Sequence, residues 1–95
     1  MNPFHHVFGG RMNAQQRALT VLASEPDAVM TAETALALIN KRGGAPLKLA
    51  TVKRSLRHLK SYGLAEATDR YERDRNRRIN LWSATGEGIR ESTYL

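Results

Sequence analysis

The side chains of this chain best suited to chemistry are the cations of residues 51–64. No Asp or Glu occurs between Glu33 and Glu66, whereas Lys and Arg recur through that interval. Four of them fall within residues 51–64: Lys53, Arg54, Arg57 and Lys60. Ammonium and guanidinium groups bind phosphate, and guanidinium also donates paired hydrogen bonds to guanine. Cations without nearby carboxylates therefore indicate recognition of a polyanion.

A helix over about residues 50–62 would hold these cations on one side. At about 100° per residue, Val52, Leu56 and Leu59 share a narrow stripe that is typical of a core-facing side. The four cations spread over the opposite side, and no acid is spaced to pair with them at i,i+4. The alternative is a merely solvated basic face, but such faces usually alternate in sign. We therefore expect this helix to contact nucleic acid.

A second basic cluster follows in residues 70–78. Its members are Arg70, Arg73, Arg75, Arg77 and Arg78. Residues 64–71 and 77–83 are predicted to be strands, and residues 72–76 between them contain the turn formers Asp74 and Asn76. Acids interleave with these arginines, so a passive, partly self-neutralised hairpin is the alternative to a hairpin that meets the DNA backbone or minor groove.

The net charge of +6 is unevenly distributed along the chain. Residues 41–78 hold twelve Lys and Arg against four Asp and Glu, and the remainder is net acidic. A one-sided basic surface is typical of nucleic-acid binding. A membrane helix would carry Trp or Phe on its apolar face, and this segment has neither. Because single-stranded RNA is usually recognised through exposed aromatics, double-stranded DNA is the partner that we expect.

Length and composition indicate one small domain without an enzyme site. The chain has no cysteine, which excludes disulfides and thiolate metal sites. It shows neither a signal peptide nor a transmembrane stretch, so we expect a cytoplasmic protein. His5-His6 has only His58 as a further histidine, so no metal site is expected. No nucleophile triad, P-loop or glycine-rich nucleotide motif occurs, and we expect no catalysis, no cofactor and no small-molecule substrate.

Residues 1–12 are predicted to form an arm, and residues 13–95 a single folded domain. Asn13 is a good cap for a first helix that ends near Ser24. Its buried side is expected to consist of Ala14, Ala18, Val21 and Leu22. Residues 28–30 suggest a short strand at a sheet edge. A second helix is expected from Ala32 to Arg42, with Thr31 as its N-cap and Gly43 just past its end.

The C-terminal part is expected to complete a small sheet. Ile79 and Leu81 share one strand face and are predicted to pack under the helices. Trp82 is either a half-buried sheet residue or a dimer contact. Residues 85–91 suggest a short terminal helix or turn. The order helix, short strand, helix, helix, strand, strand predicts an α+β fold of three helices and a β-hairpin wing, which is a winged helix-turn-helix.

Residues 51–64 resemble the recognition helix of bacterial winged-helix regulators, which reads small-Val-x-Arg-x-Leu-x-x-Leu and then Gly-Leu. The matching residues are Thr51, Val52, Arg54, Leu56, Leu59, Gly63 and Leu64. Leu81 to Thr85, followed by Gly88, is similar to the exit after the wing in many of these proteins. The resemblance, over about residues 14–83, implies DNA binding by a transcriptional regulator.

Within that superfamily the chain is most similar to the DNA-binding half of the ferric-uptake-regulator family. That family's order is followed by residues 30–33, then by residues 49–52 with Arg54, and then by Leu59 and Gly63-Leu64. Residues 43–49 match its long helix-to-helix connection. Two features depart from it. Lys53 replaces the family's usual Tyr, and the metal-binding dimerisation domain does not follow the wing, so the resemblance does not extend to metal sensing.

We expect Arg54 and Arg57 to read bases, and the wing arginines to meet the backbone or minor groove. Phosphate contacts are expected from Lys48, Thr51, Lys53 and Lys60. The predicted DNA-binding residues are Lys48, Thr51, Lys53, Arg54, Arg57, Lys60, Arg73, Arg75 and Arg77. Three functional hypotheses stay open: a sequence-specific regulator, which leads; a winged-helix protein-interaction or assembly module; and a DNA-binding component of mobile-element replication, partition or recombination. A homodimer is compatible with each. The target sequence and the direction of regulation do not follow from the sequence.

Overall fold

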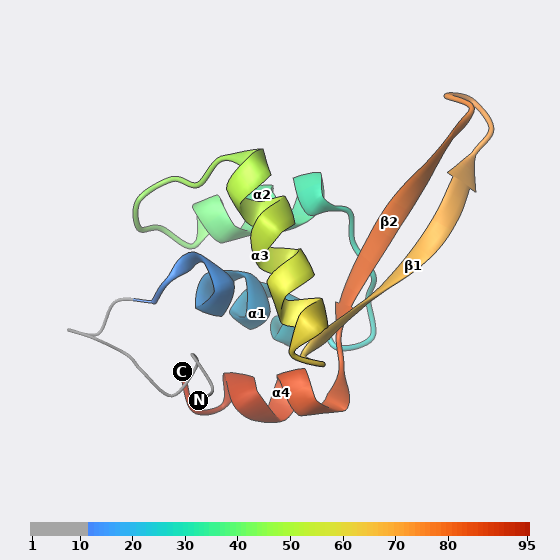
Figure 1. Cartoon of the computed structure of the whole chain (residues 1–95). Coiled ribbons are helices and arrows are strands. Elements are labelled where there is room, and N and C mark those ends of the chain that lie inside the picture. The colour runs from blue at the N-terminus through green and yellow to red at the C-terminus, as the bar shows by residue number, and fades with distance from the viewer. Residues whose placement is uncertain (1–11) are drawn as a thin grey trace.

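The computed structural model describes residues 12–95, which form four helices and one β-hairpin. The elements are α1 (Ala14–Ser24), α2 (Ala32–Lys41), α3 (Leu49–Ser61), β1 (Ala65–Glu72), β2 (Arg77–Ala84) and α4 (Gly86–Ser92). Helices α1, α2 and α3 pack together, the hairpin projects away from them, and α4 lies beneath its base (Figure 1). This is the predicted α+β arrangement of three helices and a wing. The predicted arm, including His5-His6, lies outside the described residues except for Met12.

Helix α1 begins where the sequence places its cap. The Asn13 side chain accepts a hydrogen bond from the Gln16 backbone N–H at 2.8 Å, and the Gln16 side chain accepts one from the Asn13 N–H at 2.8 Å. This reciprocal pair satisfies two backbone donors of the first turn. Three of the four residues predicted to be buried in α1 are buried, but Ala14 is only half-buried. Leu19, which was not predicted, is fully buried in its place.

Local signals also fix the ends of α2 and α3. Thr31 accepts the N–H of Thr34 at the start of α2, and the helix ends at Lys41, one residue earlier than expected. Gly43 follows with a left-handed φ of 95°. Gly63 has a φ of 76° after α3, where the Leu64 N–H donates to the Leu59 carbonyl at 2.9 Å. Glycine adopts such angles without strain, and these positions therefore end the helices sharply.

The hairpin is antiparallel, with Ala65 opposite Ala84 and Glu72 opposite Arg77. Both strands begin and end within one residue of their predicted limits. The short strand predicted at residues 28–30 is reduced to a single bridge. In that bridge Met30 exchanges two backbone hydrogen bonds with Trp82, at 2.9 and 2.7 Å. This bridge ties the wing to the segment that leads into α2.

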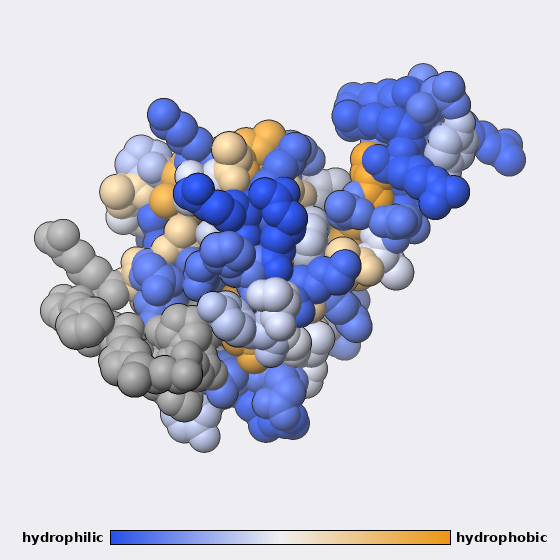
Figure 2. All heavy atoms as spheres, in the orientation of Figure 1, coloured by the Kyte–Doolittle hydropathy of each residue, from blue (hydrophilic) through white to orange (hydrophobic). Residues whose placement is uncertain are grey.

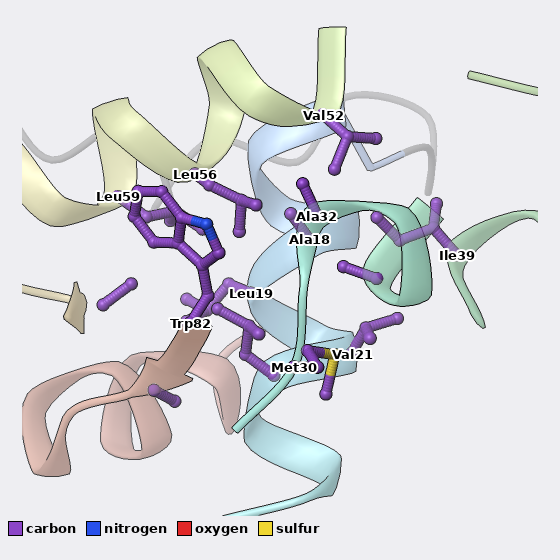
Figure 3. Close-up of a cluster of buried hydrophobic side chains, with 14 of the residues drawn as sticks. Ala18, Leu19, Val21, Met30, Ala32, Ile39, Val52, Leu56, Leu59 and Trp82 are labelled. Carbon is purple, nitrogen blue, oxygen red and sulfur yellow. The ribbon is translucent and has the colours of Figure 1, made fainter. Parts of the chain in front are cut away.

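The prediction that Ile79 and Leu81 pack under the helices is wrong. Those two side chains are only half-buried, whereas Trp82 and Ala84 on the opposite face of β2 join the core. Trp82 is 6% exposed, and Figure 3 shows its ring beside Leu56 and Leu59 under α3. Alternate residues of a strand face opposite sides, and the larger apolar area of the indole decides which face is buried. Trp82 is therefore a core residue.

The four helices are short. None of them, within residues 12–95, has the length and apolar character that a crossing of a lipid bilayer requires.

Candidate nucleic-acid interface

Helix α3 has one buried side and one cationic side, as its sequence predicts. Val52, Leu56 and Leu59 are completely inaccessible to solvent. The four cations of the helix are all exposed: Lys53, Arg54, Arg57 and Lys60. The aliphatic side chains anchor the helix against α1 and the hairpin (Figure 3), so its orientation is set by the core. The cations are then held outward on a rigid element.

These helix cations form no ion pair with an acid among the described residues. The ion pairs formed among residues 12–95 are Arg77 with Glu72, at 3.2 Å, and Arg90 with Glu87. Neither pair involves α3. The charge of the helix surface is therefore available to an external anion, and Figure 2 shows a strongly hydrophilic group of side chains over the front of the helical body.

A groove of about 670 Å³ separates α3 from the hairpin. The α3 residues that line it are Lys53, Arg57 and Lys60. Arg54 lies outside the lining because it stands about 100° around the helix from Lys53, farther from the wing. The opposite flank of α3 faces α1, where the Gln15 amide lies 2.6 Å from His58 Nδ1. Arg54 and Arg57, predicted to act alike, thus occupy different positions.

The rest of the groove lining comes from the start of α2 and from both strands. Its charged members are Glu33, Asp69, Arg77 and Arg78. With the three α3 cations, the lining holds five cations and two acids, so it remains net positive. Arg78 was counted in the basic cluster but not among the predicted contacts. Arg78 lies on the same face of β2 as Asn80 and Trp82, which also line the groove.

The N-terminus of α3 carries the two remaining predicted helix contacts. Lys48 is the N-cap residue, and its side chain makes no capping hydrogen bond. It is exposed, and Thr51 is half-buried in the first turn. The first-turn N–H groups carry the positive end of the helix dipole, which favours a nearby anion. Lys48 and Thr51 therefore flank a locally positive helix end.

The wing presents its arginines unequally. Arg73 and Arg75 lie in the connection at the tip and are exposed. Arg77 donates to Glu72 across the first pair of the hairpin at 3.2 Å, so its charge is partly offset. Asn76 turns the chain with a φ of 48°, and its side-chain oxygen accepts a hydrogen bond from the Tyr71 hydroxyl. The tip thus carries two cations, Arg73 and Arg75, that form no ion pair with any described residue. Figure 2 shows the hydrophilic surface of this tip.

A core-anchored helix beside a long hairpin defines a winged helix-turn-helix protein. The chain is similar over 84% of its length to a PadR family transcription regulator from Clostridium difficile, with a TM-score of 0.69, 16% identity and 79% of that chain covered. It is also similar over 95% of its length to ZitR of Lactococcus lactis, a zinc-responsive MarR family member, with a TM-score of 0.65, 21% identity and 59% of that chain covered.

A third similar structure is a probable transcriptional regulator from Pseudomonas aeruginosa. It has a TM-score of 0.60 and 22% identity, over 92% of this chain and 57% of that one. The chain thus spans somewhat more than half of the length of the ZitR and Pseudomonas proteins. No protein-family model and no curated protein sequence matches it. At these identities the similarity establishes the winged helix-turn-helix fold.

Proposed function

We propose that this protein binds double-stranded DNA and regulates transcription. Helix α3 enters the major groove, and the wing of residues 70–78 contacts the adjacent backbone or minor groove. The observation that carries this proposal is the cationic face of α3, which forms no ion pair among the described residues and lies beside a second basic element across one net-positive groove. A major groove about 12 Å wide admits an α-helix, and cations on both sides of a groove suit the phosphates of a duplex.

The positions of the cations suggest which of them contact bases and which contact phosphates. Arg54 is exposed, lies outside the groove lining and is assigned to a base edge, where guanidinium gives two hydrogen bonds to guanine. Arg57 is exposed and lines the groove, and we assign it to a neighbouring base. Lys53 and Lys60 line the groove toward the wing, where a flexible ammonium meets phosphate as a point charge. Lys48 and Thr51 are assigned to phosphate at the start of α3.

The structural relatives support a regulator. The Clostridium difficile protein is a PadR family transcription regulator, ZitR is a zinc-responsive member of the MarR family, and the Pseudomonas aeruginosa protein is a probable transcriptional regulator. None of these matches specifically supports the ferric-uptake-regulator family, so that finer assignment remains a hypothesis based on residues 30–64. The proposal for DNA binding does not depend on it.

Selection of binding sites from random duplex DNA tests the proposal. We expect the full chain to enrich a short motif containing at least one guanine that tolerates no substitution, because a bidentate arginine contact distinguishes guanine from the other bases. Two-fold symmetry in the motif would indicate that two copies bind together. Enrichment of no sequence, with equal retention of all duplexes, would reduce the proposed function to non-specific DNA binding.

The wing should contribute affinity without contributing much to folding. Changing Arg73 and Arg75 together to Ser removes two exposed charges, and surface changes usually alter stability by less than about 0.5 kcal/mol each. Each lost phosphate contact should lower the salt slope of binding by about 0.9. We therefore expect weaker binding, a slope smaller by one to two units and an unchanged melting temperature.

Arg77→Ser is the matched comparison on the same hairpin. It also breaks the exposed pair with Glu72, which is expected to contribute at most ~1 kcal/mol to stability. Its effect on binding should be smaller than that of the double change, because Glu72 already offsets part of its charge. Full retention of binding by the Arg73 and Arg75 double variant would show that the wing is a passive connection.

A further inference from the structure

The connection between α2 and α3 is long for a helix-turn-helix and has an unusual backbone. Residues 42–48 separate the two helices, whereas many such turns use three or four residues. Gly43 and Gly44 adopt left-handed φ angles of 95° and 87° in succession. A loop of this length can adopt many conformations, but α3, which follows it, has a single orientation. Something outside the loop therefore has to hold it.

Arg17 of α1 binds this loop at two points. Its Nη1 donates to the Ala45 carbonyl at 2.7 Å, and its Nη2 donates to the Gly43 carbonyl at 2.9 Å. The two donors belong to one planar group, so they fix the relative positions of two peptide planes on either side of Gly44. Hydrogen bonds from an ionised donor are also about twice as strong as neutral ones. Arg17 thus clamps the middle of the loop to α1.

Gly44 fits this clamp in two respects. Its φ of 87° favours glycine, and a Cβ built there would lie 3.3 Å from Arg17 Nη2. At Gly43 the φ is similarly positive, but a Cβ would meet no atom within 4 Å. Of the two glycines, only Gly44 would therefore place a Cβ against the guanidinium. The backbone there and the side chain of Arg17 form one packed unit.

Asn40 holds the other end of the same loop. Its Oδ1 accepts the Leu47 N–H at 2.9 Å, and its Nδ2 donates to the Leu47 carbonyl at 3.3 Å. Leu47 directly precedes Lys48, the N-cap residue of α3. The loop is consequently fixed in its middle by Arg17 and at its exit by Asn40.

We propose that Arg17 is a positioning residue for DNA recognition: by clamping the loop, it sets the entry of α3 so that Arg54 and Arg57 align with base edges. This inference rests on the proposed function. Bidentate base contacts require accurate placement, whereas a lysine bound to phosphate tolerates a shifted helix because its charge acts through a flexible stem. Release of the loop should therefore cost sequence discrimination more than general affinity for DNA.

The test measures the affinity for the selected duplex and for random duplex in the same assay. Arg17→Met keeps an unbranched apolar stem but removes the donors and the charge. Arg17→Lys keeps the charge and loses the planar pair of donors. Arg42→Met removes a nearby exposed charge that lies outside the clamp. We expect both Arg17 variants to reduce the ratio of the two affinities, by roughly tenfold for Met, which corresponds to the loss of one base contact. Arg42→Met should leave that ratio unchanged.

Amide hydrogen exchange of the free protein gives a second measurement that needs no DNA. We expect faster exchange at residues 45–50 in Arg17→Lys, with the slow amides of α1 and the hairpin unaffected. If Arg17→Met does not fold, the Lys variant alone decides. The assignment would be overturned if Arg17→Lys changed neither the amide exchange nor the affinity ratio. It would also be overturned if Arg17→Met weakened binding to all duplexes equally and Arg17→Lys bound them as tightly as the unmodified chain. If the unmodified chain binds no duplex while exchange still quickens in Arg17→Lys, the loop clamp stands and the role in DNA recognition falls with the proposed function.

Discussion

Arg54→Ala is expected to weaken binding to the selected duplex by about 1–3 kcal/mol, a loss of roughly 5- to 150-fold, and to relax the preference at one base pair. Arg54 is exposed on α3 and lies outside the groove that the wing shares. It forms no ion pair with the rest of the described chain, so its removal should leave the fold intact. Affinity for random duplex should fall far less, because a base contact carries the sequence preference.

Lys60→Ala is the matched control on the same helix. Lys60 is also exposed, but it lines the groove between α3 and the wing, where phosphate is the expected partner. Its loss should weaken all duplexes about equally and lower the salt slope by about one unit. If Arg54→Ala and Lys60→Ala weakened selected and random DNA to the same extent, the assignment of Arg54 to a base would be wrong.

Trp82→Ala is expected to destabilise the domain by about 3–5 kcal/mol, the usual cost of replacing a buried large aromatic residue by alanine. Its ring is 6% exposed and packs beside Leu56 and Leu59 beneath the cationic helix. The free energy of unfolding of a small domain is only about 5–15 kcal/mol, so this loss would consume a large part of it. Chemical denaturation should show a much lower midpoint.

Leu81→Ala, one residue away in β2, provides the comparison. Leu81 is half-buried on the opposite face of the strand, so its truncation leaves no closed cavity under the helices. We expect a loss below that of most buried leucines, which cost about 2–5 kcal/mol. Both variants keep the backbone bonds between residue 82 and Met30. Equal destabilisation by the two changes would contradict the core assignment of Trp82.

The elements of the fold could be predicted because their signals are local. The cap at Thr31, the glycine after α3 and the three-residue stripe of that helix each depend on a few neighbouring residues. The facing of β2 could not be predicted, since both of its faces carry apolar side chains. Ile79 and Leu81 suggested one face and Trp82 the other. Trp82 is the side chain that packs in the core under α3, and no local sequence pattern indicates the space available there.

The candidate site was predictable to a similar degree. The spacing of the α3 cations placed them on one exposed side, where the structure has them. Their division between an outer face and a groove depends on where the wing lies, which only the folded chain shows. The partial neutralisation of Arg77 by Glu72 follows from the strand register. Arg17 had no sequence signal, because its partners are carbonyl groups of the backbone 26 and 28 residues away.

The most direct test of the cationic surface is the salt dependence of duplex binding by the unmodified protein. If α3 and the wing together neutralise about five phosphates, the logarithm of the affinity should fall against the logarithm of the salt concentration with a slope of about −4 to −5. The slope is measured by titrating one duplex at several salt concentrations. Affinity that does not change with salt, or the absence of binding at low salt, would contradict the proposal that this surface meets DNA.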